Sequence, residues 1–202
     1  MADPAAELKE RFSRQVILPG VGVEGQQKWA QTPIVLAAEG TALEAATTAL
    51  TAAGASLITF LKDPFDAVPQ GSTILVLTQN KDLRRSFSRR FRSQGQSVFF
   101  AWAMGTGWAL FLATHKGSQC PCLECFEVMN PKAFGEPAPG VPRLMAAMAV
   151  SEILQFILKS QSPLEGKVWV TYLESGVSFL HEVSPIYKCT ARLLAEGAPV
   201  TP

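Results

Sequence analysis

Strong charge of either sign is absent from this chain of 202 residues, of which 17% are charged, with a formal net charge of +1. Without a global field, the chain is not expected to bind nucleic acid or an anionic membrane surface. Four cysteines are too few for a disulfide-stapled scaffold of this length. The first fifteen residues also lack the apolar core of a signal peptide, so we expect a cytoplasmic protein.

Apolar residues, in contrast, are plentiful. They make up 48% of the chain, with a mean hydropathy of +0.16, and they are sufficient for a sizeable buried core. The length predicts a single domain over residues 1–202. We divide this domain into an N-terminal arm (1–30), a first half (31–115) and a second, cysteine-containing half (116–202).

Hydrophobic patterning predicts an α/β fold. Short apolar runs at 34–38, 57–61 and 73–77 have the length of buried parallel strands, and a helix over 42–53 lies between the first two. Such a βαβ unit is the opening of a doubly wound sheet. The other expected elements are a helix over 5–12, a flexible stretch around Gly20, Gly22 and Gly25, an amphipathic helix from Asp82, a buried helix over 144–158, and a hairpin of 168–172 with 177–183.

The most apolar run, 98–114, is long enough to raise the question of a membrane-spanning helix. Gly105 and Gly107 interrupt it, and its neighbours are rich in aromatic residues, which favours two buried strands that meet at a turn. Its aromatic residues are then core residues rather than a ligand cage. Together with the later hairpin, these strands predict an antiparallel part at the C-terminal end of the sheet.

Several motifs occur in a fixed order along the chain. They are the string RFSRQVILPG from Arg11 followed by GVEGQ, the element Thr78-Gln79-Asn80 with Arg84, the run Pro121–Cys125, and Gly140-Val141 before the buried helix. This series closely resembles the ThiF/MoeB/HesA family, bacterial relatives of ubiquitin-activating enzymes, over nearly the whole chain. The resemblance implies a Rossmann-like sheet that binds ATP and Mg²⁺, adenylation of the C-terminal glycine of a small ubiquitin-like or sulfur-carrier protein, and a dimer.

The expected nucleotide site departs from that family, first at its phosphate loop and its ribose-binding residue. In register with the glycine-rich loop, residues 38–43 read Ala-Glu-Gly-Thr-Ala-Leu, so Gly40 alone is retained and Glu39 brings a negative charge. Where the family has an aspartate for the ribose hydroxyls stands Lys62, which has no acceptor, with Asp63 one step later. The half 31–115 therefore resembles a shortened nucleotide-binding unit.

The groups for triphosphate and magnesium are also reduced. Residues 64–72 alone separate the second strand from the third, where the family has a longer segment with triphosphate-binding cations. Gln79 replaces an aspartate that would hold Mg²⁺. Asn80 and Arg84 are retained, although Asn80 also suits a helix cap and Arg84 a surface ion pair. Arg14 resembles an arginine that reaches into the neighbouring subunit's nucleotide pocket and, without nucleotide, would hold a dimer together.

The cysteines resemble part of the family's zinc site, which has two C-x-x-C pairs. Cys122 and Cys125 match the first pair, and Cys189 matches one member of the second. Cys120, or less favourably His115, is the candidate for a fourth ligand. Free thiols in a reducing cytosol and a catalytic thiol are the alternatives to a zinc site.

Arginines are concentrated between residues 84 and 92, within the amphipathic helix. Leu83, Phe87 and Phe91 form the apolar face of this helix at helical spacing. We therefore expect the arginines to form a solvated face rather than a nucleic-acid site.

These departures predict a shortened family member with an eroded ATP site. The expected function is a non-catalytic protein-binding or dimer-partner subunit in a sulfur-carrier or ubiquitin-like activation system, as a homodimer or as a heterodimer with a related subunit. One alternative is an active adenylyltransferase that uses Asp63, Asn80 and Lys81. The other is a zinc-stabilised binding module that takes no nucleotide.

Overall fold

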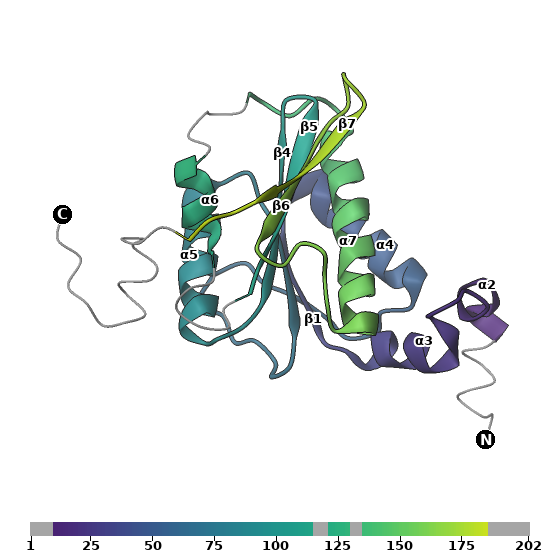
Figure 1. Ribbon diagram of the computed structural model, residues 1–202. Coiled ribbons are helices and arrows are strands. Elements are labelled where there is room, and N and C mark those ends of the chain that lie inside the picture. The colour runs from purple at the N-terminus through teal and green to yellow at the C-terminus, as the bar shows by residue number, and fades with distance from the viewer. Residues whose placement is uncertain (1–9, 115–120, 130–134, 186–202) are drawn as a thin grey trace.

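The structure, a computed structural model, describes residues 10–114, 121–129 and 135–185. It contains one seven-stranded sheet with the strand order β2-β1-β3-β4-β5-β6-β7 (Figure 1). The first four strands in this order run parallel, and β5, β6 and β7 follow antiparallel. The strands are β1 (Ile34–Ala38), β2 (Ile58–Phe60), β3 (Thr73–Leu77), β4 (Val98–Met104), β5 (Gly107–Ala113), β6 (Lys167–Tyr172) and β7 (Val177–Glu182). The predicted mixed α/β fold is confirmed.

Helices cover both faces of the sheet (Figure 1). On one face α4 and α7 pack against the sheet, with α3 against α7, and on the other face lie α5 and α6. Each layer encloses its own hydrophobic core, one around Leu36, Leu75 and Phe99, the other around Val76 and Phe100. The helices are α2 (Ser13–Val16), α3 (Gly22–Gln31), α4 (Gly40–Ala53), α5 (Lys81–Ser93), α6 (Leu123–Met129) and α7 (Val141–Lys159).

Two expectations, one about the N-terminal arm and one about the first half, are wrong. The stretch around Gly22 and Gly25 is the helix α3, which places Trp29 in the core and lies so close to α7 that a Cβ at Gly25 would meet Leu158 at 2.8 Å. The second strand is a short edge strand rather than a buried one, because β1 is its only neighbour in the described sheet, and Phe60 is 53% exposed. The helix expected over 5–12 falls mostly outside the described residues.

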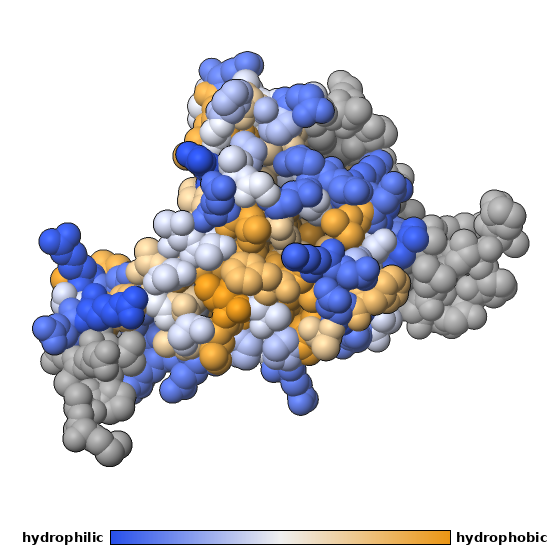
Figure 2. Space-filling model, turned by 180° about the vertical axis from the view of Figure 1, so that it is seen from behind, coloured by the Kyte–Doolittle hydropathy of each residue, from blue (hydrophilic) through white to orange (hydrophobic). Residues whose placement is uncertain are grey.

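The long apolar helix α7 satisfies the length and composition of a membrane span. One side of α7 packs into the core through buried residues such as Met145, Ala149 and Ile153. The other side is partly exposed to solvent, and Leu144 on it is 48% exposed. The expectation that it is buried all round is therefore wrong. Figure 2 shows the molecule from behind, on the side away from β6 and β7. Apolar residues gather near the centre of this face of the molecule, among hydrophilic ones.

Candidate functional site

The carboxyl ends of the parallel strands meet at one edge of the sheet, where open α/β sheets bind their ligands. Glu39 and Gly40 follow β1, Thr78 and Asn80 follow β3, and Asp63 comes shortly after β2. The expected site residues of the first half thus lie at this edge of the sheet, whereas Arg14 belongs to the N-terminal arm. The partners of their side chains indicate what each can do.

Glu39 is fixed by a hydrogen bond across this edge. The hydroxyl of Thr78 donates to a carboxylate oxygen of Glu39 at 2.9 Å, and the same hydroxyl accepts from the backbone N–H of Asn80 at 3.2 Å. Glu39 immediately precedes α4, which starts with Gly40 at a φ of +55°. A carboxylate therefore lies beside the helix N-terminus where the resemblance places a phosphate.

Asn80 is the N-cap of α5. Its side-chain oxygen accepts hydrogen bonds from the backbone N–H groups of Asp82 and Leu83, each at 3.0 Å. These are two of the donors that a helix leaves unpaired at its N-terminus. The helix-cap interpretation of Asn80 is confirmed by this geometry.

Gln79 also has a structural partner. With its amide nitrogen facing the carbonyl oxygen of Ala103, the side chain donates to that oxygen at 2.8 Å and accepts from the Ala103 N–H at 2.9 Å. The amide thus extends the pairing of β3 with β4 beyond the last strand residue, Leu77. Its carbonyl oxygen is engaged with the backbone.

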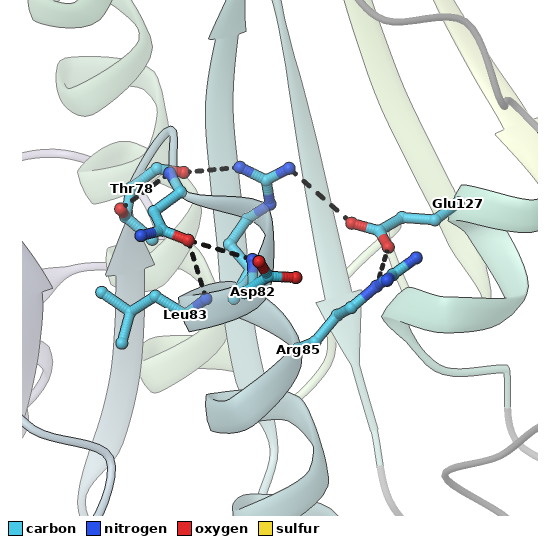
Figure 3. A network of polar contacts seen from close by, with 7 residues as sticks. Thr78, Asp82, Leu83, Arg85 and Glu127 are labelled. Atoms are coloured by element: carbon cyan, nitrogen blue, oxygen red, sulfur yellow. Dashed lines mark hydrogen bonds and ion pairs between the residues drawn. The ribbon is translucent and has the colours of Figure 1, made fainter.

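Arg84 is buried, so its interpretation as a surface ion pair is wrong. One terminal nitrogen donates to the carbonyl oxygen of Thr78 at 2.8 Å, and the other lies 3.7 Å from a carboxylate oxygen of Glu127 on α6 (Figure 3). The guanidinium also lies over the ring of Trp102, 4.9 Å from its centroid. Burial lowers the pKa of Arg84, and the Glu127 carboxylate opposes part of that shift.

The expectation of a solvated arginine face holds only in part for Arg85 and Arg89, whose side chains are 33% and 44% exposed but are paired with glutamates. Arg85 donates to Glu127 at 2.6 Å, and Arg89 donates to Glu124 at 2.7 Å. Both glutamates belong to α6 and are less than one tenth exposed. Helix α6 covers this side of α5, and the sequence analysis missed these two glutamates. Their i, i+3 spacing opposite an arginine-rich helix is the signal that points to them.

Asp63 belongs to a tight turn. Its carboxylate accepts from the N–H of Phe65 at 2.8 Å, and its own N–H donates to the carboxylate of Asp66 at 3.1 Å. Arg90 holds the same turn by donating to the carbonyl oxygens of Pro64 and Asp66. The shortened segment is therefore a loop held by its own hydrogen bonds, and the Asp63 carboxylate stabilises it.

The Cys122 and Cys125 sulfur atoms lie 3.7 Å apart, and both side chains are buried. Tetrahedral zinc with Zn–S bonds of about 2.3 Å holds two sulfurs about 3.8 Å apart, so this pair fits one half of such a site. Cys120, Cys189 and His115 lie outside the described residues. Within the described parts of the chain, no group of three or more His, Cys, Asp or Glu side chains could hold a metal ion.

Arg14 lies away from this edge. It is exposed on α2 and lines a hollow of about 340 Å³ together with Phe12, Gln15 and the end of α4. Its predicted reach into a second subunit stays a prediction.

The expected core aromatics are buried, including Phe99, Phe100, Trp102 and Trp108, none of which is more than 5% exposed. Several exposed apolar side chains lie on the hairpin of β6 and β7, where Tyr172, Val177 and Phe179 are 38–44% exposed. The sequence analysis did not foresee this exposed apolar surface.

Comparisons with known proteins support the fold. No protein-family model matches the sequence, and no curated protein matches it. Among solved structures, the crystal structure of E. coli MccB matches with a TM-score of 0.66 and 12% identity, over 84% of this chain and 67% of that one. MccB with MccA-N7isoASN matches with a TM-score of 0.70 and 13% identity, over 91% and 74%.

A heterocyclase solved in complex with substrate and cofactor also matches, with a TM-score of 0.67 and 16% identity. The match covers 94% of this chain but only 29% of the heterocyclase. At these identities the likeness concerns the fold alone. The fold of this chain is thus similar to that of MccB and to that of part of the heterocyclase.

Proposed function

We propose that this chain is a ThiF/MoeB-like protein with an eroded ATP site, which acts by binding a protein partner rather than by adenylation. The partner is a related subunit, a second copy, or a small ubiquitin-like or sulfur-carrier protein. The main support is that the side chains at the carboxyl edge of the sheet are already engaged with one another or with the backbone.

Electrostatics at the start of α4 support the loss of ATP binding. A phosphate bound there would lie next to the Glu39 carboxylate, which the Thr78 hydroxyl holds in place. Two like unit charges about 4 Å apart near a protein surface repel by about 4 kcal/mol before salt screening. Glu39 therefore takes the place of an anionic ligand.

The groups for magnesium and triphosphate have other partners. Gln79 pairs with Ala103, Asn80 caps α5, and Asp63 closes the turn of the shortened loop. Mg²⁺ prefers carboxylate or phosphate oxygens in a near-octahedral arrangement, and none of these three side chains offers a free carboxylate. Arg84, the retained cation, is buried between Thr78 and Glu127.

An active adenylyltransferase is the alternative, and the position of Asn80 and Arg84 at the ligand-binding edge favours it. Similar structures include MccB solved with ATP and MccB solved with MccA. In this alternative, Asp63, Asn80 and Lys81 would contact the nucleotide. Asp63 and Asn80 would have to leave or share their present roles, as Asn80 would by releasing the N–H groups of Asp82 and Leu83.

ATP–pyrophosphate exchange with Mg²⁺ and a carrier protein separates the two functions. We expect no exchange, and no thermal shift when ATP and Mg²⁺ are titrated to millimolar concentration. A ligand at a hundred times its Kd stabilises a protein by about 2.7 kcal/mol, so a working site would be visible. Exchange that Asn80→Ala abolishes would establish the active enzyme.

Glu39→Gln tests the stated cause of the loss. It removes the charge but keeps the size of the side chain, and its amide oxygen can still accept from Thr78. ATP binding by this variant, absent from the wild type, would identify the carboxylate as the obstacle. A wild type that already binds ATP as well as the variant does would contradict this cause.

The zinc-stabilised module adds to this proposal, because a structural metal is compatible with the loss of ATP binding. Cys122 and Cys125 would supply half of the ligands, and Cys189 and Cys120 are proposed for the rest. Zinc at such a closed site stabilises the fold and takes no part in a reaction.

A further inference from the structure

The outer edge of β7 ends the described sheet without a further strand. Natural edge strands are commonly shortened, bulged, or protected by Lys or Pro, since an open edge pairs readily with another chain. The six residues of β7 read Val-Ser-Phe-Leu-His-Glu, and each is paired with β6 in unbroken register. Within the strand there is no Lys, Pro or bulge, and its one carboxylate, Glu182, is at its end.

Exposed apolar side chains are concentrated beside this edge. Five of the eleven large exposed apolar residues found in the described parts of the chain lie between 172 and 180. They occur on both faces of the hairpin: Tyr172, Val177 and Phe179 on one, Leu180 on the other. The Tyr172 and Phe179 rings are 6.4 Å apart, and the Phe179 and His181 rings are 5.5 Å apart and stacked.

The register identifies which backbone groups of β7 face outward. The N–H of Val183 donates to the carbonyl of Gly166, directly opposite in the β6–β7 pairing, so this is a hydrogen-bonded pair. Such pairs alternate along an antiparallel ladder. The backbone groups of residues 177, 179 and 181 therefore face β6, and those of Ser178, Leu180 and Glu182 face outward.

We propose that β7 pairs with β7 of a second copy of this chain, antiparallel about a two-fold axis at Leu180. In this register Leu180 of each copy faces Leu180 of the other, and Ser178 faces Glu182. All three outward-facing residues then form hydrogen-bonded pairs, and the two sheets become one continuous sheet. No other two-fold register pairs all three of them.

The side chains in this register are complementary to themselves, which favours a second copy as the occupant. On one face Phe179 meets His181 of the other copy, so the aromatic series of Tyr172, Phe179 and His181 continues across the axis. On the other face the two Leu180 side chains cover each other. Glu182 is opposite a serine rather than another carboxylate, so no like charges meet directly.

This inference rests on the protein-binding part of the proposed function and specifies the partner and surface. It does not depend on the state of the nucleotide site. ATP–pyrophosphate exchange tests the loss of ATP binding, and the oligomeric state tests the β7 interface, so the two proposals can fail separately.

Sedimentation equilibrium of the full chain, at loadings from about 1 to 100 µM, tests the proposal. We expect a dimer for the wild type and monomers for both Leu180→Lys and Leu180→Glu, each of which places like charges face to face at the axis. Mixing the two variants in equal amounts is expected to restore a dimer, because the charges then attract. Leu144→Lys is the matched control, since Leu144 is 48% exposed against 47% for Leu180, and it should remain a dimer.

A wild type that is monomeric at 100 µM would overturn the proposal and leave the edge for a different partner. A dimer that survives both Leu180 variants would place the interface elsewhere and would equally overturn it. The mixing step also detects misfolding, since two merely unfolded variants would not associate when combined.

Discussion

The guanidinium of Arg84 and the carboxylate of Glu127 lie 3.7 Å apart, in side chains that are 8% and 7% exposed. The arginine comes from the helix that starts at the carboxyl edge of the sheet, and the glutamate comes from the helix that carries Cys125. The pair therefore connects the eroded nucleotide edge to the cysteine-containing helix. An arginine held in this way is a structural element of the protein rather than a free phosphate ligand.

The first prediction concerns this pair. Glu127→Leu leaves Arg84 buried without its counterion and is expected to reduce the free energy of unfolding by about 3 kcal/mol. The double variant with Arg84→Met should recover part of that loss, because no buried charge is then unpaired. Urea unfolding of the single and double variants measures both effects.

Glu44→Gln is the control for that prediction. Glu44 and Arg143 also lie 3.7 Å apart, but their side chains are 72% and 64% exposed. Loss of an exposed pair costs less than about 1 kcal/mol. If Glu127→Leu cost no more than this control, burial would not be the source of the pair's importance.

The second prediction concerns the cysteines. The purified chain should contain one zinc ion per molecule by elemental analysis, and Cys122→Ser or Cys125→Ser should lose it, with a lower melting temperature. A strong chelator should destabilise the wild type, because metal binding contributes to the free energy of folding. His181→Gln changes an exposed histidine on β7 and should keep the zinc. A purified wild type that contains no zinc, and whose stability does not change when chelator is added, would refute the zinc site.

The third prediction concerns the role of Asn80 as the N-cap of α5. Asn80→Ala removes the side-chain acceptor for two N–H groups of α5 and should cost about 1 kcal/mol in thermal unfolding. Asn80→Asp should retain most of the stability, because aspartate is an equally good N-cap. Equal stability of all three proteins would show that the cap is unimportant.

The fourth prediction is a pH dependence. Burial raises the pKa of Glu152 on α7, with Lys159 opposing part of the shift. The folded protein then holds the proton more tightly than the unfolded chain, so this group reduces stability as the pH rises above about 4.3, its ordinary pKa. Glu152→Gln should therefore raise the melting temperature at pH 7 and have little effect at pH 3. A constant difference at both pH values would exclude titration as its cause.

Local patterns in the sequence were sufficient for the framework of the fold. The strands over 34–38 and 73–77 occur with the predicted bounds, because a short apolar run between turn residues is favourable only as a buried strand. Gly54 ends α4 with a φ of +97°, a conformation that glycine adopts without strain. The turn at Gly105–Gly107 and the hairpin near the C-terminus also follow from local residues.

The Glu39 side chain shows how far the candidate site was predictable. The charge next to the expected phosphate position was visible in the sequence, whereas its bond to Thr78, 39 residues away, was not. The departures at Gln79 and Asp63 were equally visible in the sequence, but their backbone partners were not. Gln79 pairs with β4, and Asp63 pairs with the folded loop that follows it.

The sequence by itself determined the order of the elements, the α/β class and the residue types at the edge of the sheet, because these depend on short-range periodicity and turn chemistry. Only the tertiary structure decided which of those elements are covered. Glu127 meets Arg85 from 42 positions away, and contacts of this kind pair arginines that look fully solvated in the sequence with buried glutamates of α6. The same holds for the open edges at β2 and β7, since the exposure of a strand depends on its neighbours in space.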